Sequence, residues 1–262
     1  MNRAALRFVA VLTSVMIAGF SIRASAQEIA RQKWKQADTT SVFSYDESEI
    51  SGPKPWTHER FHNNAENFRF AILGDRGGGA SPLGTYERAI DQLNWLQPEF
   101  VISVGDFVEG YTSDQKEMDE QWEEFEEIIG KLEMPFFYVR GNHDINVPLT
   151  RKAWSERRGP QYYHFLYKDV LFIVLDTEDA ERPTPPNMEE DINTYNRLKK
   201  ESPEKAMAFI IEWMETPEAQ EAFGHAAKVA FPEEQIEWCK KVLKENEDVR
   251  WTFLFLHEPV WD

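Results

Sequence analysis

The sequence predicts an α/β fold built on mixed sheets, and three observations support this. Short apolar runs, typical of buried strands, occur at 69–75, 100–106, 134–144, 161–167, 170–176 and 251–259. Amphipathic stretches between them predict helices at 85–96, 114–132 and 232–246. Only Lys168 and Asp169 separate two of the runs, which predicts a tight antiparallel hairpin. Alternating strands and helices indicate a sheet covered on both faces.

The first 26 residues have the pattern of a secretory signal peptide. Arg3 and Arg7 precede an apolar run at 8–20, and Ala24-Ser25-Ala26 supplies a small-residue cleavage site. The alternative is an uncleaved membrane anchor, although a spanning helix needs roughly 20 apolar residues. We expect cleavage after Ala26, a secreted or periplasmic protein, and no stable membrane anchor afterwards.

The rest of the chain divides by composition. Residues 27–66 are polar and broken by Gly52, Pro53 and Pro55, which predicts an extended N-terminal arm or linker. The main domain is expected at 67–262. Within it, residues 178–230 are acidic and proline-rich with helical runs, which predicts a helical insertion. This insertion is either a lid over the site or ordinary surface helix.

The charge of the chain restricts its partners. The formal net charge is −17, from 46 acidic and 29 basic residues. Phosphate backbones are bound by clustered Lys and Arg, so nucleic acid is not an expected partner. The single cysteine, Cys239, allows no internal disulfide.

Metal-binding residue types stand at the ends of separate predicted strands. They are Asp75, Asp106, Asn142 with His143, and His257. Ligands of open α/β sheets gather beyond the carboxyl ends of the strands, so these side chains should meet at one rim. Carboxylate, amide and imidazole donors without thiolate suit Mn, Fe or Zn. One carboxylate could bridge two such ions, and the pair of ions would activate water and hold a phosphoryl oxygen.

The motifs Gly74-Asp75, Gly105-Asp106, Gly141-Asn142-His143-Asp144 and the later His257 resemble those of the calcineurin-like metallophosphoesterase superfamily. The resemblance covers roughly residues 67–262. It implies a four-layer α/β/β/α sandwich and two divalent or trivalent metal ions. It also implies hydrolysis of small-molecule phosphate mono- or diesters by a metal-activated water.

The resemblance also implies a role for each site residue. Asp75 would bind the first metal, Asp106 would bridge both, and Asn142 and His257 would bind the second. His143 would hydrogen-bond the phosphate and protonate the leaving oxygen.

The sequence departs from the family pattern in two places. Gly77 stands where the family has a histidine, in a glycine-rich stretch that either forms a tight turn or brings N–H groups to a phosphate. Arg76 in the same stretch is a candidate anion clamp. The family's final Gly-His-x-His is not found between His257 and Asp262. We therefore expect an incomplete domain that binds metal poorly. The alternative function is a non-catalytic exported binding module with the same fold.

Overall fold

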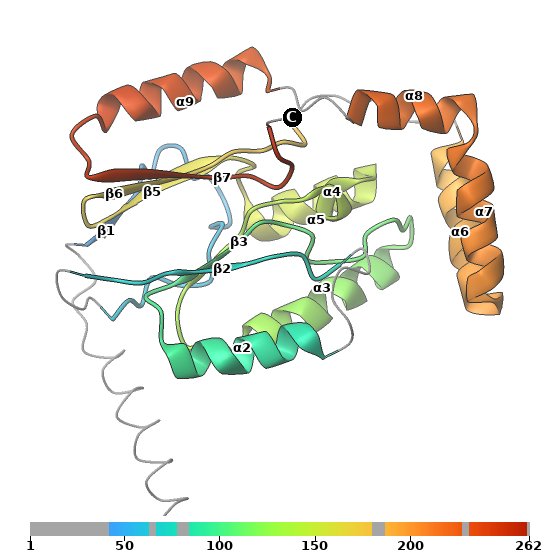
Figure 1. Cartoon of the computed structure of the whole chain (residues 1–262), viewed down its shortest axis with the longest axis horizontal. Helices are drawn as coiled ribbons and strands as arrows, with labels where there is room; N and C mark the ends of the chain where they lie inside the picture. Colours follow the sequence, from blue (N-terminus) through green and yellow to red (C-terminus); the bar gives the residue numbers. More distant parts are fainter. Residues whose placement is uncertain (1–41, 63–66, 78–83, 180–186, 227–230, 261–262) are drawn as a thin grey trace, which may run out of the picture.

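The computed structural model describes residues 42–62, 67–77, 84–179, 187–226 and 231–260, and their strands form two sheets (Figure 1). The first is fully parallel, in the order β2 (Ala71–Leu73), β3 (Val101–Ser103), β4 (Phe136–Phe137). The second has the order β1 (Phe43–Ser44), β5 (Tyr163–Tyr167), β6 (Val170–Val174), β7 (Trp251–Phe255). In the second sheet β5 and β6 form the predicted antiparallel hairpin, and β6 and β7 are parallel.

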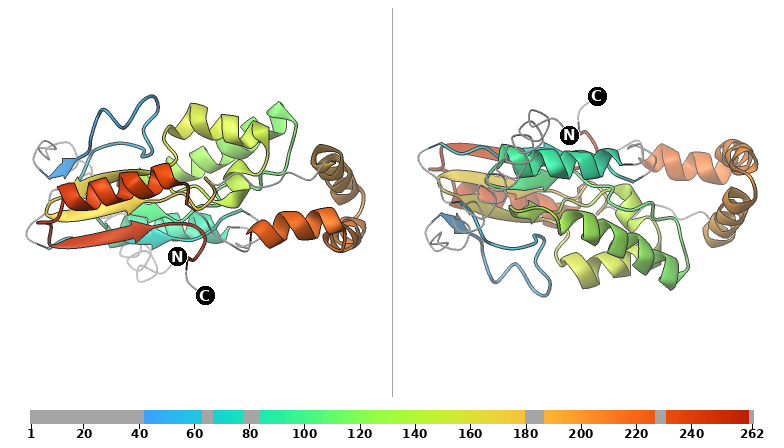
Figure 2. Two further views of the ribbon diagram at one scale, coloured as in Figure 1. Left: turned by 90° about the horizontal axis from the view of Figure 1, so that it is seen from above. Right: turned by 90° about the horizontal axis from the view of Figure 1, so that it is seen from below.

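Helices cover the outer face of each sheet (Figures 1 and 2). The three-stranded sheet is covered by α2 (Thr85–Leu96), α3 (Gln115–Ile129) and α5 (Pro148–Arg158). The four-stranded sheet is covered by α9 (Glu233–Glu245), whose Val242 packs on Leu171 and Ile173 of β6. The order helix, sheet, sheet, helix confirms the predicted four-layer fold.

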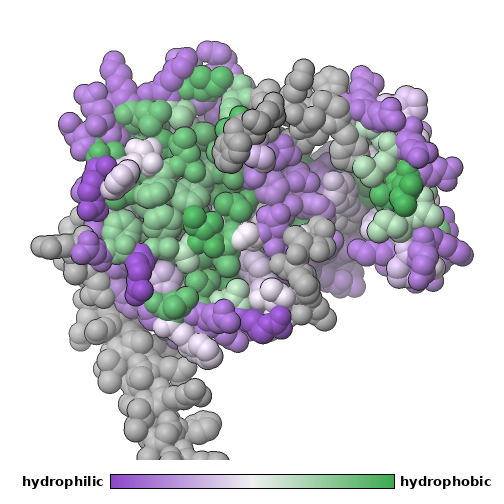
Figure 3. All heavy atoms as spheres, viewed as in Figure 1, coloured by the Kyte–Doolittle hydropathy of each residue, from purple (hydrophilic) through white to green (hydrophobic). Residues whose placement is uncertain are grey.

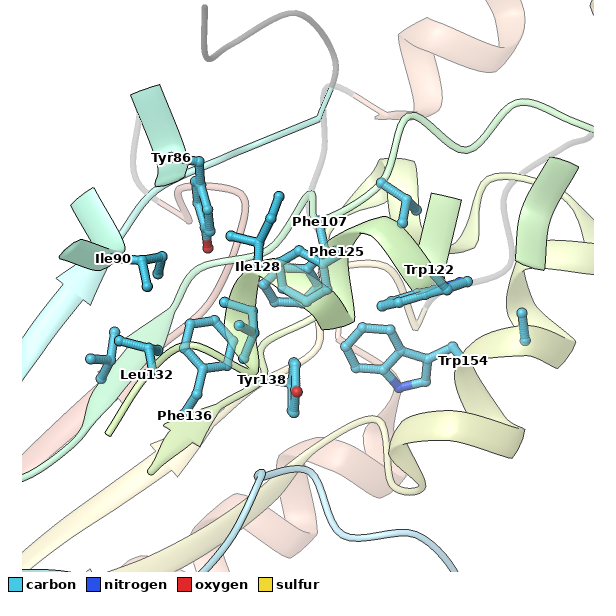
Figure 4. Close-up of a cluster of buried hydrophobic side chains, with 14 of the residues drawn as sticks. Tyr86, Ile90, Phe107, Trp122, Phe125, Ile128, Leu132, Phe136, Tyr138 and Trp154 are labelled. Atoms are coloured by element: carbon cyan, nitrogen blue, oxygen red, sulfur yellow. The ribbon is translucent and has the colours of Figure 1, made fainter. Parts of the chain in front are cut away.

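Aromatic side chains fill the core between the sheets. Phe137 of β4 stacks on Phe165 of β5 with ring centroids 4.2 Å apart, and Phe165 stacks on Phe172 of β6 at 4.8 Å. A second core lies beneath the three-stranded sheet, where Phe107 packs on Phe125 with centroids 4.8 Å apart (Figure 4). Phe107 directly follows Asp106, so its burial anchors a loop that carries a predicted ligand.

The described part of the predicted N-terminal arm differs from expectation, because it packs onto the sandwich. Phe43 in β1 pairs with Tyr167, Trp56 forms a bridge with Phe137, and the side chain of Phe61 is fully buried. Three aromatic residues spaced far apart in a polar segment supply enough apolar area to hold it in place. Residues 42–62 are therefore part of the domain, whereas residues 27–41 lie outside the described residues.

The described residues of the predicted insertion are helical and stand beside the sandwich (Figures 1 and 2). They form α6 (Met188–Glu201), α7 (Pro203–Met214) and α8 (Pro217–Ala226). Ser202 joins α6 to α7 and caps α7, accepting a hydrogen bond from the Lys205 N–H at 3.4 Å. The Trp213 indole donates to Asp191 at 2.9 Å, which fastens α7 to α6.

Two of the edge strands, β2 and β7, expose apolar side chains on one side of the sandwich (Figure 3). Ile72 of β2 and both Trp251 and Leu254 of β7 are more than half exposed, at 57%, 63% and 53%. Phe70 packs edge-on against Phe253 at 5.2 Å, so β2 and β7 lie side by side. In the described part of the chain no further strand pairs with β2 or β7 on this side, and exposed apolar area at a sheet edge favours association with other polypeptide.

In the part of the chain that the structure describes, no helix combines the length and apolarity needed to cross a membrane. The predicted signal peptide, residues 1–26, lies outside that part.

Candidate metal centre and active site

The predicted site residues follow the carboxyl ends of their strands. Asp75 follows β2, Asp106 follows β3, and His257 follows β7. Asn142 and His143 open the short helix α4 (Asn142–Ile145) after β4. Because β2, β3 and β4 are parallel, their ends meet at one rim, and β7 of the other sheet reaches the same rim.

Two glycines let the loops and His257 approach this closely. Gly105 has φ of 110°, and a Cβ there would lie 2.8 Å from the Nδ1 atom of His257. A Cβ on Gly141 would lie 2.9 Å from the His257 ring and would also overlap Asp106. Any side chain at either position would push His257 away from the rim, so the Gly-Asp and Gly-Asn steps are sterically required.

Asp106, Asn142 and His257 form a compact donor cluster. The Nε2 atom of His257 lies 2.9 Å from Asn142 Oδ1 and 3.6 Å from Asp106 Oδ2. The His257 Nδ1 atom lies 2.7 Å from the carbonyl oxygen of Val104, which can only accept, so Nδ1 carries a proton. The Nε2 atom is then directed at two oxygens. A ring oriented by a backbone carbonyl in this way is typical of a metal-binding histidine.

Burial and neighbouring charges have opposing effects on the pKa values of Asp106 and His257. Burial raises the pKa of Asp106, while His257 and the His143 N–H lower it and the Asp75 carboxylate raises it further. Burial lowers the pKa of His257, but Asp106, the Val104 carbonyl and Asp75 outweigh burial, so the pKa is raised. A carboxylate and an imidazole whose pKa values are both raised favour added positive charge, and such a pair is suited to a cation.

The donor chemistry therefore fits the predicted metals. Asp106, Asn142 and His257 offer two oxygens and a nitrogen for one ion, whereas a second ion would need Asp75 to approach Asp106. Among the described residues, no three His, Cys, Asp or Glu side chains form a metal-binding group. Asp106 and His257 supply two such side chains, Asn142 supplies an amide, and Asp75 does not lie close enough to them to complete a group of three.

His143 lies next to the cluster with its ring held from one side. Its backbone N–H donates to Asp106 Oδ1 at 3.0 Å. Its Nδ1 atom lies 2.8 Å from the Glu109 carbonyl oxygen and must be the donor. With Nδ1 engaged by this carbonyl, Nε2 is the ring atom that could meet a substrate.

Arg76 contributes to the site through its backbone. Its N–H donates to the Asp106 carbonyl oxygen at 2.9 Å. Its guanidinium group binds Glu124 of α3 at 2.6 Å and the Phe107 carbonyl oxygen at 3.1 Å. The predicted anion clamp would have to exchange Glu124 for substrate.

Asp144, the last residue of the Gly141-Asn142-His143-Asp144 motif, has a structural role that the motif alone does not indicate. Its buried carboxylate accepts from the N–H groups of Gly141 and Asp106 through Oδ2, at 2.9 and 3.0 Å. It accepts from those of Phe107 and Val108 through Oδ1, at 2.8 and 3.4 Å. Burial raises the pKa of Asp144 to about 7, and the N–H group of Gly141 opposes the rise. Asp144 therefore joins the two loops that carry Asp106 and Asn142. The only sequence feature that could have pointed to this role is the position of Asp144 directly after His143.

The structure decides between the two interpretations of Gly77. The Gly77 N–H donates to the Asp106 carbonyl oxygen at 2.7 Å, and a Cβ on Gly77 would overlap the Val108 carbonyl group. Gly77 therefore belongs to a tight turn, and this backbone has no room for the histidine of the family pattern. Gly78 and Gly79 lie outside the described residues.

Gly77→Ala is expected to cost about 1–3 kcal/mol of stability, because the added methyl group forces the turn away from Val108. Thermal unfolding measures this, with Gly74→Ala as the matched control, since a Cβ on Gly74 meets no atom within 4 Å. Gly77→His should lose stability too and bind no additional metal. A stable Gly77→His variant with higher metal occupancy would contradict this interpretation.

Comparison with known proteins identifies the family. A family model described as calcineurin-like phosphoesterase matches residues 68–262, well over half of the chain. A comparison with curated proteins found no match. The matched stretch contains both sheets apart from β1, and the whole donor cluster of Asp106, Asn142 and His257. The chain therefore belongs to the calcineurin-like phosphoesterase family, as its motifs predicted.

Proposed function

We propose that this protein is an exported, metal-dependent hydrolase of small-molecule phosphate mono- or diesters. The family is one of metallophosphoesterases and generally uses a dinuclear metal centre. The observation that most supports the proposal is the convergence of His257 Nε2, Asn142 Oδ1 and Asp106 Oδ2 within 2.9–3.6 Å. Export rests on the signal-peptide pattern of residues 1–26, and an N-terminus at Gln27 in the exported protein would support it.

Each site residue has its own role in the proposed reaction. Asp106, Asn142 and His257 would hold one ion, and Asp75 would share Asp106 for the other. When bound, such ions supply Lewis acidity to the phosphoryl oxygens and lower the pKa of water. His143 keeps a proton on Nδ1 for the Glu109 carbonyl. In the imidazolium form its Nε2 carries a second proton, which can bind a phosphate oxygen and pass to the leaving oxygen, returning the ring to neutral imidazole.

A panel of phosphate monoesters and diesters, assayed on the full-length protein with Mn, Fe or Zn, tests the proposal. We expect hydrolysis that a chelator abolishes and added metal restores. Metal stoichiometry measured on the same samples should fall with the chelator. Metal bound without turnover of any ester would overturn the enzyme proposal.

A non-catalytic exported binding module is the second candidate, and the Gly77 turn favours it. The first metal lacks an imidazole there, and the backbone excludes one. A protein of this kind would bind phosphate or an anionic ligand at the rim without cleaving it. Calorimetric titration with inorganic phosphate, beside the ester panel, separates the two functions.

A further inference from the structure

One loop contacts His143 in several ways. We call residues 109–113 the His143 loop. The Glu109 carbonyl oxygen accepts from the His143 ring, and the Tyr111 ring meets the same ring edge-on with centroids 5.0 Å apart. Asn146 links the two segments, because it accepts from the Tyr111 N–H at 3.1 Å and donates to the His143 carbonyl oxygen at 3.2 Å. The orientation of His143 therefore depends on where this loop lies.

The His143 loop has a conformation that needs support. Tyr111 has φ of 44°, in the left-handed region that bulky side chains rarely adopt. Such a residue costs of order 1–3 kcal/mol and persists only where surrounding contacts hold it. The Asn146 bond holds the N–H side of Tyr111, so the carbonyl side needs a donor of its own.

The helical insertion supplies that donor. Asn196 of α6 donates through Nδ2 to the Tyr111 carbonyl oxygen at 2.8 Å. One turn earlier, Asn193 accepts from the Ser113 hydroxyl at 3.0 Å. Both bonds join residues at least 80 positions apart in the chain. His143 and Asn146 thus hold the first part of the His143 loop, and Asn193 and Asn196 of α6 hold its last part.

We infer that Asn196 is a positioning residue for His143, acting through Tyr111. The inference rests on the proposed function for its effect on catalysis. The contacts run in series from Asn196 to the Tyr111 carbonyl, and from the Tyr111 ring to the His143 ring. The Asn196 bond fixes the Tyr111 peptide, so losing it frees the Tyr111 ring to leave the edge of the imidazole. The insertion then sets how His143 Nε2 meets the leaving oxygen of a phosphoester.

The first measurement does not depend on activity. Ring ¹⁵N signals of His143, assigned by their loss in His143→Gln, should show a proton on Nδ1 in the unaltered protein. In Asn196→Ala these signals should shift or broaden. Asn196→Gln keeps a donor and should restore them at least in part. Arg197→Ala is the matched control, because Arg197 is an exposed neighbour on α6 that pairs with Glu201. It should leave the signals unchanged.

The second measurement is kinetic. Asn196→Ala should lower kcat about 10-fold with KM changed less than about 2-fold, because a misplaced proton donor weakens the transition state more than substrate binding. The loss should be larger for esters with basic alkoxide leaving groups than for nitrophenyl esters, which leave without a proton. Arg197→Ala should have the same kcat and KM as the unaltered protein for both kinds of ester.

The outcomes are distinct. Unchanged His143 signals in Asn196→Ala would overturn the inference, as would an equal kcat loss for good and poor leaving groups. If the unaltered protein hydrolyses no ester, the proposed function fails, and the ring signals alone still decide whether Asn196 positions His143.

Discussion

Asp106→Asn should reduce phosphoesterase activity further than Asp75→Asn. Asp106 Oδ1 accepts from the His143 N–H and Oδ2 faces His257 Nε2, so both oxygens serve the site. An amide has one acceptor oxygen and no charge, so it can serve only one of these partners and would hold both metals poorly. We expect kcat/KM to fall at least ~10³-fold, which is about 4 kcal/mol of transition-state stabilisation.

The Asp75→Asn variant should lose less activity, with kcat/KM falling roughly 10–100-fold, because in the proposed centre Asp75 would hold only the ion that has no imidazole from position 77. The measurement is kcat/KM at saturating metal together with metal stoichiometry. Asp91→Asn, on the exposed face of α2, is the matched control and should retain full activity and occupancy. Equal residual rates for the Asp75 and Asp106 variants would show that Asp106 does not bridge.

Regular elements could be predicted from the sequence where burial is periodic. The helix expected at 85–96 matches α2 residue for residue, and the hairpin turn at Lys168 and Asp169 lies where expected. The helix α5 was not predicted, although Pro148 stands at its first position as prolines often do. Its inward side chains, such as Trp154, are few among charged ones, so the apolar pattern is weak.

The segment 42–62 could not be placed from its composition. Its strand β1 has only two residues, too few to show an alternating pattern. Phe43, Trp56 and Phe61 are held by aromatic partners far along the chain, such as Phe137 and Phe165. A contact of this kind leaves no local signal in the sequence.

The site residues, too, could be predicted only where a local sequence pattern marks them. The strand-end rule identified the candidate ligands Asp75, Asp106, Asn142 and His257, because a strand and the residues that follow it can be recognised from a short stretch of sequence. Asp144 and Asn196 act through bonds that span 36–38 and 85 positions. Their side chains are common surface types, and only the fold shows which N–H or carbonyl groups they meet.

Asp144→Asn should destabilise the protein by about 2–4 kcal/mol, because the carboxylate accepts from four backbone N–H groups. Each oxygen of Asp144 faces two of these donors. Whichever way an asparagine amide is turned, its NH₂ group faces two N–H groups and leaves both unpaired in a buried place. Unfolding in urea should show a lower midpoint with an unchanged slope.

Asp114→Asn is the control for losing a carboxylate. Asp114 caps α3 and accepts one N–H, from Lys116 at 2.8 Å, and asparagine caps helices equally well. Its stability should change by less than about 0.5 kcal/mol. Below its unfolding transition, the Asp144 variant should also bind metal more weakly, since fewer hydrogen bonds then join the loops bearing Asp106 and Asn142. If Asp144→Asn were as stable as Asp114→Asn, the four bonds would not hold the two loops together.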